Sequence, residues 1–397
     1  MINQRLPTDE NAREAGTNVN VTLMHRDCEV LAFRLDAASG DVSEIRPLEH
    51  IELAPVGIRT DEGLSVFALT IFVHRRRIAR KRKDLPRILD ALKAAHPIEL
   101  ALRARGFSLT DQYWYRLEGD ETTWAGSNFF DNEWDPSFAR AVLHEDYWAL
   151  ARSDSFVPDV TCGGAARKAW VSNGFGPHMI KAPKHNDAEA YGEVLCSRML
   201  SRMLDEGEYV PYELVNVGDK VYSTCPAMVR PGEDLVTPMA EKRNPADSRW
   251  WNSYEDLLAR LRVANAGQAC AKVAVVDALA FKGDSHSGNY GFIRNTEADV
   301  ARLAPFFDLA GAFGTFGDNA SCAASERDAL RALRIAAKHS NLNPKWDYSW
   351  FDPSSLDGFA DEIEESLSSC EGLSDSYPAI ARQLFEMQLA YVTSTAE

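Results

Sequence analysis

Two aspartates and an asparagine in the second half of the chain have the order and spacing of a phosphoryl-transfer site. Asp284 and Asn289 are five positions apart within the Gly-rich stretch 281–292, and Asp308 follows in the sequence Phe-Phe-Asp-Leu-Ala-Gly of residues 306–311. In kinases one Asp accepts the proton of the attacking hydroxyl, while an Asn and a second Asp hold the magnesium ions that neutralise the phosphates. This spacing predicts Asp284 as the catalytic base and Asn289 and Asp308 as metal ligands.

The elements expected around these residues bring them together. An apolar helix over 271–281 ends where the Gly-rich turn begins, because glycine and polar turn residues do not continue a helix. A short strand at 290–293 and a return strand at 303–307 would form a hairpin whose ends carry Asn289 and Asp308. Asp, Ser, Gly and Asn are also common in ordinary turns, so the motif alone is weak evidence and its context decides.

Length and composition predict an ordinary soluble protein. With 397 residues the chain is long enough for two or three domains, and 45% apolar and 26% charged residues are typical of globular proteins. No export signal or membrane span is visible, so we expect a cytoplasmic protein that does not act at a membrane. Seven cysteines without any Cys-x-x-Cys pair fit a reducing compartment and argue against a zinc module or a disulfide scaffold.

The chain is acidic overall but contains one strongly basic segment. A formal net charge of −16 argues against a general nucleic-acid coat. The run Arg75–Lys83, however, places seven cations in nine positions. Such a run binds an acidic partner or nucleic acid, or it is the solvated face of a helix. The solvated face is the favoured interpretation, because no aromatic residues are interleaved for stacking on bases.

The first 150 residues predict a flexible terminus and a small α/β unit. Residues 1–18 are polar without periodicity, and we expect them to be flexible. Short alternating runs and helical patterns predict strands at 20–25, 30–35 and 42–45 and helices at 85–95 and 99–105. The stretch 113–134 is too rich in aromatic residues for a linker and should dock firmly, because exposed rings forgo the stabilisation of burial. We therefore assign residues 19–150 to an N-terminal α/β subdomain with an aromatic docking segment.

A Gly-rich segment precedes the next predicted strand, at 168–171. Small residues at Gly163, Gly164 and Ala165, after Thr161, would let backbone N–H groups approach phosphate closely and bind a nucleotide. A plain glycine turn is the alternative interpretation. No G-x-x-x-x-G-K-[S/T] sequence occurs, so a Walker-type loop is excluded.

The predicted strand 178–181 ends in Lys181, which is placed to reach the α and β phosphates of a nucleotide. A lysine at a strand edge that merely extends into water is the alternative. Twelve residues later, Glu193 lies on the predicted helix 188–204 and can pair with Lys181, as phosphoryl transfer in kinases requires. Glu189 lies one turn earlier on the same face and is the competing partner.

Two further patterns complete a two-part body. Alternating runs at 212–217 and 220–225 are joined by Gly-Asp, a hairpin signal, and the chain then loosens into several prolines, where a hinge would fall. From about residue 250 the pattern is mainly helical. We therefore predict a β-rich small lobe over 151–228 and a helical large lobe over 229–397.

Taken together, these motifs resemble the HipA-like serine/threonine kinases. The likeness covers roughly residues 155–320, and the residues that carry it in order are Thr161-Cys-Gly-Gly-Ala-Ala-Arg-Lys, Met179-Ile-Lys, Glu193, Asp284-Ser-His-Ser-Gly-Asn and Phe307-Asp. Upstream, Ser108-Leu-Thr-Asp-Gln-Tyr-Trp and Asn128-Phe-Phe-Asp-Asn are similar to the CtkA-like branch. The combination is more specific than any single motif.

The resemblance implies an α+β fold of two lobes, like that of protein kinases, with an extra N-terminal α/β subdomain. It also implies ATP and Mg²⁺ as cofactors and transfer of phosphate to a Ser or Thr of a protein substrate. The roles that it implies are catalytic base for Asp284, metal ligands for Asn289 and Asp308, phosphate binding for Lys181 and helix partner for Glu193.

The resemblance has further implications for regulation and partners. In HipA-like enzymes a Ser or Thr in the Gly-rich loop can be autophosphorylated, which ejects the loop, and Thr161 holds the matching place. Family members act as toxins of toxin–antitoxin pairs or as effector-like kinases. An antitoxin or regulator protein is therefore an implied partner, and export as an effector stays open.

Two other functions stay open at this point. A nucleotide-sensing pseudokinase, or a regulator that binds DNA or protein through Arg75–Lys83, would lack catalysis, and salt-sensitive DNA binding would reveal the DNA-binding form. A phosphotransferase that acts on a small molecule is the weaker third alternative.

Overall fold

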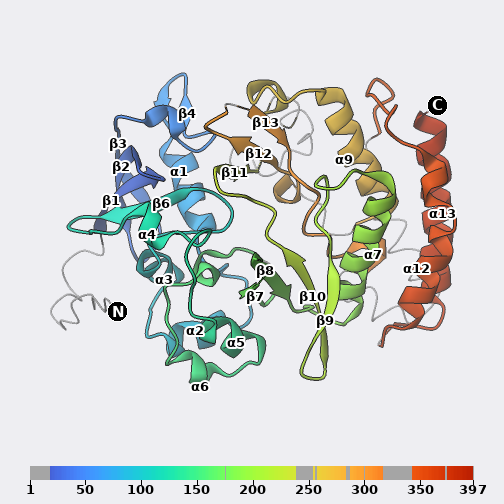
Figure 1. The fold of residues 1–397 in the computed structure, drawn as a ribbon, viewed down its shortest axis with the longest axis horizontal. Helices are drawn as coiled ribbons and strands as arrows, with labels where there is room; N and C mark the ends of the chain where they lie inside the picture. The colour runs from blue at the N-terminus through green and yellow to red at the C-terminus, as the bar shows by residue number, and fades with distance from the viewer. Residues whose placement is uncertain are drawn as a thin grey trace.

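The chain folds into several small antiparallel sheets with helices around them, a mixed α/β arrangement (Figure 1). The computed structural model describes residues 18–174, 176–237, 254, 257–282, 287–298, 300–315, 342–371 and 373–396. Of the terminus predicted to be flexible, residues 1–17 lie outside this part, and the first strand begins at Asn18.

The N-terminal sheet has the strand order β3-β2-β1-β6, and all neighbouring strands are antiparallel. Its strands are β1 (Asn18–His25), β2 (Cys28–Asp36), β3 (Val42–Pro47) and β6 (Tyr113–Leu117). The strands predicted at 20–25, 30–35 and 42–45 are confirmed, with slightly different ends.

Both faces of this sheet are covered. Successive residues of a strand point to opposite faces, yet Leu23 and Met24 of β1 are both buried. Leu23 packs in the core beneath α1 (Val66–Arg75), which contributes Leu69 and Val73. Met24 belongs to an aromatic cluster on the other face. The sheet is thereby held between a helix and the rest of the molecule.

The aromatic stretch 113–134 packs against the strand that follows the Gly-rich segment. Trp114, Trp124 and Phe129 are buried together with Phe107 and with Trp170 of that strand. The rings of Phe107 and Trp114 stack with their centroids 5.1 Å apart. Burial of so many rings explains why this stretch is ordered, although it contains little regular secondary structure.

The basic run Arg75–Lys83 is not the solvated helix face that we predicted. Helix α1 ends at Arg75, and three of the following arginines are buried, namely Arg76, Arg77 and Arg82. Arg76 pairs with Asp111, and Arg82 donates two hydrogen bonds to Asp84, of 2.7 and 3.0 Å. Buried charges require partners of opposite charge. The sequence of the basic run does not show which residues supply those partners.

The middle sheet has the order β7-β8-β10-β9 and carries the Gly-rich segment and Lys181. Its strands are β7 (Lys168–Asn173), β8 (Gly176–Lys181), β9 (Glu213–Val217) and β10 (Lys220–Pro226), and helix α7 (Ala188–Met203) follows β8. Both hairpins and the helix agree with the sequence prediction. Ala169 and Tyr222 of this sheet pack on Ala139 and Leu143 of α5 (Ser137–Leu143).

A third sheet, β11-β12-β13, holds the hairpin predicted between Asn289 and Asp308. It consists of β11 (Glu233–Val236), β12 (Phe292–Asn295) and β13 (Val300–Leu303). Strand β11 was not predicted, because it begins with Glu233 and Asp234, and charged residues are not expected in a buried strand. Asp234 is nevertheless buried: it lies 2.9 Å from Nε2 of His25 and accepts a hydrogen bond from the backbone N–H of Gln112. These contacts join the third sheet to the N-terminal one.

Helices form the C-terminal side of the molecule, where Figure 1 shows α7, α9, α12 and α13 next to one another. Helix α9 (Ala266–Ala280) is buried almost throughout, and α12 (Phe359–Ser368) and α13 (Tyr377–Ala396) pack against it and against α7. Phe313, which follows Asp308 by five residues, lies at the centre of this core against Phe281, Phe359 and Phe385.

The remaining elements are short: β4 (Arg59–Thr60), β5 (Gly63–Leu64), α2 (Leu85–Ala91), α3 (Pro97–Arg103), α4 (Trp124–Ser127) and α6 (Tyr147–Leu150). The two helices predicted at 85–95 and 99–105 correspond to α2 and α3, and α3 begins at Pro97, a position that tolerates proline. No helix in the described ranges is long and apolar enough to span a bilayer.

Candidate active site

Lys181 is the centre of a charge cluster contributed by three separate segments. It is the last residue of β8, and its Nζ lies 2.6 Å from Oε1 of Glu193 and 2.6 Å from Oδ1 of Asp308. Glu193 belongs to α7, and Asp308 follows β13. The Asp308 side chain is 45% exposed and that of Glu193 only 2%. The cluster is therefore closed on the helix side and open to solvent at Asp308.

Glu193, and not Glu189, contacts Lys181. The second oxygen of Glu193, Oε2, accepts a hydrogen bond from the hydroxyl of Ser223 on β10, so both carboxylate oxygens are held. Glu189 is also buried, but its Oε2 accepts a hydrogen bond of 2.7 Å from the backbone N–H of Lys184. The two acids of one helix face thus have different tasks: Glu193 fixes Lys181, and Glu189 fixes the turn between β8 and α7.

The backbone around Asp308 is anchored to the segment before β9. Phe306 exchanges backbone hydrogen bonds with Glu208 and Val210, of 2.9 and 3.0 Å. Asp308 has φ of 52°, a left-handed conformation that is uncommon for residues other than glycine. Its backbone N–H donates a hydrogen bond of 3.1 Å to the hydroxyl of Tyr212. These contacts hold the unusual turn that directs the carboxylate to Lys181.

Charge pairing keeps both Lys181 and Asp308 ionised at neutral pH. The Lys181 ammonium is the largest influence on Asp308 and, against the effect of burial, holds the pKa of that carboxyl far below its usual range. Burial alone would lower the pKa of Lys181, but the nearby charges of Asp308 and Glu193 outweigh burial and raise it. An ionised carboxylate at this place is a hard oxygen donor, as Mg²⁺ requires.

Lys168 is a second cation of the site that the sequence analysis did not identify. It lies directly opposite Lys181 in the β7–β8 hairpin, so both side chains project from the same face of the sheet. Its ammonium adds to that of Lys181 in lowering the pKa of Asp308. A Cβ on Gly164 would lie 2.5 Å from Nζ of Lys168, so this ammonium reaches over the Gly-rich segment. The only signal in the sequence is the equal distance of both lysines from the hairpin turn.

Asn289 lies in the described part of the chain, whereas Asp284 does not. Asn289 is buried at the end of a short helical turn, Ser287–Asn289, that leads into β12. Gly291 accepts a backbone hydrogen bond of 2.9 Å from Ala304, so the chain segments carrying Asn289 and Asp308 leave the same end of the hairpin. Asp284 lies outside the described residues, and its role as catalytic base stays a prediction.

The predicted nucleotide-binding segment is divided between a buried and an open part. Thr161 is 5% exposed, and its hydroxyl donates to the backbone oxygens of Phe107 and Pro158, at 2.8 and 3.0 Å. Thr161 therefore faces the protein interior in this conformation. Gly163, Gly164 and Ala165 form the following bend, in which Gly164 is exposed with φ of 92°. A side chain there would be strained, so glycine is required for this bend.

The side chains present fit a Mg²⁺–nucleotide ligand. Mg²⁺ is usually bound through one or two carboxylates and further oxygen atoms, which the Asp308 carboxylate and the Asn289 amide can provide. The ammonium groups of Lys168 and Lys181 are suited to phosphate. In the described part of the chain, no three His, Cys, Asp or Glu side chains gather in one place.

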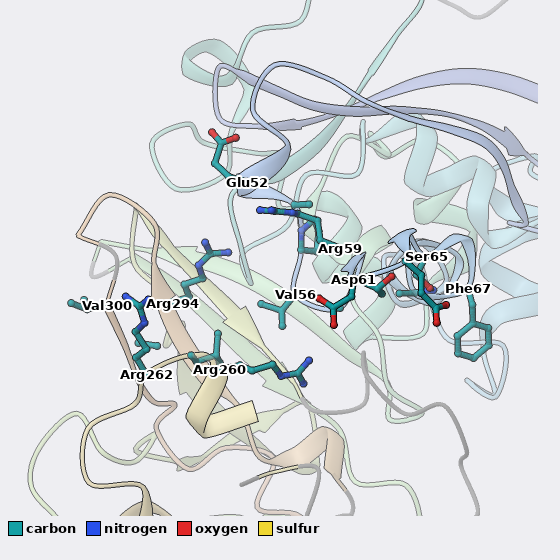
Figure 2. A pocket seen from close by; sticks show the side chains of 18 residues that line it. Glu52, Val56, Arg59, Asp61, Ser65, Phe67, Arg260, Arg262, Arg294 and Val300 are labelled. Carbon is teal, nitrogen blue, oxygen red and sulfur yellow. The ribbon is translucent and has the colours of Figure 1, made fainter. Parts of the chain in front are cut away.

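A hollow lies away from the charge cluster around Lys181, and none of the predicted site residues lines it. It has a volume of about 960 Å³ and lies between the β4–β5 hairpin and the β12–β13 hairpin. Figure 2 shows Arg260, Arg262 and Arg294 on one wall and Asp61 on the other. The volume of a hollow therefore does not select it as the candidate site, and we base that choice on the charges that converge on Lys181.

Gly192 sets the distance between α7 and the segment after Asp308, and this yields a first prediction. A Cβ at residue 192 would lie 2.3 Å from Oγ1 of the buried Thr315 and 3.0 Å from the oxygen of Ala312. We expect Gly192→Ala to lower the free energy of unfolding by about 1–3 kcal/mol, as overpacking does, and to displace Glu193.

Urea denaturation measures this effect. Gly174→Ala is the matched control, because nothing lies within 4 Å of a Cβ there. Adding Thr315→Ala to Gly192→Ala should recover part of the loss, because the closest atom is removed. Wild-type stability of Gly192→Ala would contradict the role assigned to this close approach.

Asp159, two residues before Thr161, leads to a prediction about how the stability of the protein depends on pH. Its Oδ1 accepts a 2.8 Å hydrogen bond from the backbone N–H of Trp170, while Oδ2 meets no donor among the described residues. Burial raises its pKa to about 7. The folded state then binds this proton more tightly than the unfolded state, so this group's contribution to stability falls as pH rises from about 4 to 7.

Asp159→Asn keeps the hydrogen bond to Trp170 and removes the titration. We expect the free energy of unfolding of the wild type, relative to that of the variant, to decrease between pH 4 and 7 by on the order of 1 kcal/mol per pH unit. Denaturation curves recorded across this pH range measure the difference. Parallel pH profiles of the two proteins would show that Asp159 is not protonated in the folded protein.

No family model matches the chain, and no curated protein matches its sequence. Among solved structures, Helicobacter pylori proinflammatory kinase CtkA is similar over 58% of this chain and 92% of its own, with 13% identity and a TM-score of 0.41.

A second solved structure matches nearly the whole chain. It is HipA of the Shewanella oneidensis MR-1 toxin–antitoxin system, determined with HipB and its operator DNA. The similarity covers 95% of this chain and 99% of that one, with 13% identity and a TM-score of 0.56. At this identity the likeness concerns the fold. The chain has a HipA-like fold, and the resemblance found in its sequence is confirmed to that extent.

Proposed function

We propose that this protein is an ATP- and Mg²⁺-dependent serine/threonine protein kinase of the HipA type. The observation that carries the proposal is the position of Lys181, 2.6 Å from both Glu193 and Asp308. Kinases require a lysine that is paired with an acid on a helix, together with an Asp that binds the metal. The HipA-like fold supports the proposal, because the sequence motifs around these residues resemble those of the HipA-like kinases.

Each residue has a task in the proposed reaction. Glu193 fixes Lys181, which binds phosphate oxygens together with Lys168. Asp308 and Asn289 would hold Mg²⁺. When bound, Mg²⁺–ATP supplies the phosphoryl group, and the metal neutralises its charge. Asp284 accepts the proton of the substrate's Ser or Thr hydroxyl.

The two predicted lobes correspond to separate parts in this proposal. The sheet β7-β8-β10-β9 with α7 would be the small lobe, residues 151–228, and the third sheet with α9, α12 and α13 would be the large lobe, residues 229–397. Lys181 and Glu193 come from the first part, and Asn289 and Asp308 from the second. The N-terminal subdomain, residues 19–150, would brace both through its contacts with Trp170 and Asp234.

Autophosphorylation at Thr161 belongs to the same proposal. The Thr161 hydroxyl is buried and donates to the oxygen of Phe107, so it can receive phosphate only when the segment leaves this position. A phosphate would add about −1.5 to −2 charges and cannot return to a site lined by backbone oxygens. Phosphorylation would therefore favour the displaced segment and silence the kinase.

The proposed partners follow from the chemistry and from the fold. A protein with an acceptor Ser or Thr is the substrate. Because the similar HipA was determined with HipB and operator DNA, we propose an antitoxin-like regulator as a second partner, in the cytoplasm. The alternative of a DNA-binding regulator that uses Arg75–Lys83 is weakened, because Arg76, Arg77 and Arg82 are buried.

A phosphotransfer assay tests the proposed function. Purified protein is incubated with labelled ATP and Mg²⁺ in the presence of lysate proteins, and label on protein is measured. We expect Lys181→Met, Asp284→Asn and Asp308→Asn each to reduce transfer roughly hundredfold or more, because each removes a group that stabilises the transition state. Asp131→Asn, an exposed carboxylate elsewhere, is the matched control and should keep full activity.

Two outcomes of this assay would contradict the proposal. Transfer by Asp284→Asn or Asp308→Asn equal to that of the wild type would remove the kinase mechanism. Label that appears only on small molecules would indicate the small-molecule phosphotransferase. Mass spectrometry of the wild-type reaction should find phosphate on Thr161, and phosphate at other sites only would contradict the regulatory step.

A further inference from the structure

Next to the Gly-rich segment lies a hollow of about 420 Å³ that is lined by several lysines and arginines, called the basic cleft below. Its cations are Lys81, Lys83, Arg87, Arg167 and Lys184, and His185 also lines it. They come from the loop after α1, from α2, from the residue before β7 and from the turn between β8 and α7. Ala165 of the Gly-rich segment forms part of the wall. These positive charges are clustered in a chain whose net charge is −16.

The two carboxylates in the basic cleft do not cancel this charge. Asp84 is occupied by the buried Arg82, through hydrogen bonds of 2.7 and 3.0 Å. Glu145 lies 2.5 Å from Arg167 and 3.0 Å from Lys220. Asp84 is therefore paired with a cation outside the basic cleft, and Glu145 is shared between Arg167 of the cleft and Lys220 outside it. Lys81 and Lys83 are exposed, and neither forms an ion pair within the ranges that the structure describes.

The loop that carries Lys81 and Lys83 is held in place by the buried Arg82 between them. Arg82, between Lys81 and Lys83, is 1% exposed in its side chain and also donates to the backbone oxygen of Lys168 at 3.4 Å. Lys168 begins β7 and faces the site around Lys181. The loop with the two exposed lysines is therefore tied to the strand that carries the site, which a merely solvated charge run does not require.

We propose that the basic cleft binds an acidic segment of the protein substrate. The proposal rests on the proposed kinase function and adds a substrate class to it. With a volume of about 420 Å³, the hollow has room for a few side chains but not for a nucleic-acid duplex. Its wall at Ala165 adjoins the proposed nucleotide site, so an acidic segment bound there holds the acceptor hydroxyl of the same polypeptide near that site. Flexible lysines and arginines accommodate different Asp and Glu sequences.

Binding can be measured without catalysis. A fluorescein-labelled oligoglutamate peptide is titrated with full-length protein at low salt and without nucleotide, and its fluorescence anisotropy is recorded. The test variant is Lys81→Gln with Lys83→Gln, in which both changes are on the surface. The control is Lys93→Gln with Lys345→Gln, which changes the net charge equally at exposed lysines outside the basic cleft.

We expect the wild type and the control to bind the peptide alike and the test variant to bind about tenfold more weakly, which corresponds to about 1.4 kcal/mol. Added salt should weaken the wild-type complex. A short duplex DNA and an uncharged Gly-Ser peptide are measured in parallel. Absent peptide binding, equal loss in both variants, or tighter binding of DNA than of peptide to the same lysines would overturn the proposal. Because no nucleotide is present, these results are independent of whether the protein is an active kinase.

Discussion

The ammonium of Lys181 between the carboxylates of Glu193 and Asp308 is the interaction on which the proposed site depends. A partly buried charge is tolerated only when it is paired. Here one cation, Lys181, is paired with two anions from distant parts of the chain. The pairing also determines the chemistry. It keeps the half-exposed Asp308 and the largely buried Lys181 ionised, and a charged Lys181 is what phosphate binding would require.

The surrounding fold can be understood as the means of holding these three side chains together. Ser223 on β10 fixes the second oxygen of Glu193, and the hydroxyl of Tyr212 fixes the backbone of Asp308. Gly192 permits α7 to approach the segment that follows Asp308. Asp234 joins the third sheet to the N-terminal one through His25 and Gln112. The N-terminal part therefore supports the site without contributing a residue to the charge cluster.

Local patterns in the sequence predicted most elements and the residues of this cluster. The hairpin β7–β8 with its terminal Lys181 and helix α7 with Glu193 were visible because turn residues and apolar periodicity act over short distances. Lys168 was missed because its importance arises from pairing across a hairpin. The buried Arg76 and Arg82 were misjudged and β11 was overlooked, because burial of charge depends on tertiary partners such as Asp111 that local pattern does not reveal.

The most direct test of the central claim is to locate the metal. Mn²⁺ can replace Mg²⁺, and its anomalous X-ray scattering marks its position in crystals grown with a non-hydrolysable ATP analogue. The account predicts Mn²⁺ bound to the Asp308 carboxylate and the Asn289 amide oxygen, with the triphosphate in contact with Lys181. Nucleotide bound elsewhere, or Mn²⁺ away from Asp308 while Lys181 keeps both carboxylates, would contradict it.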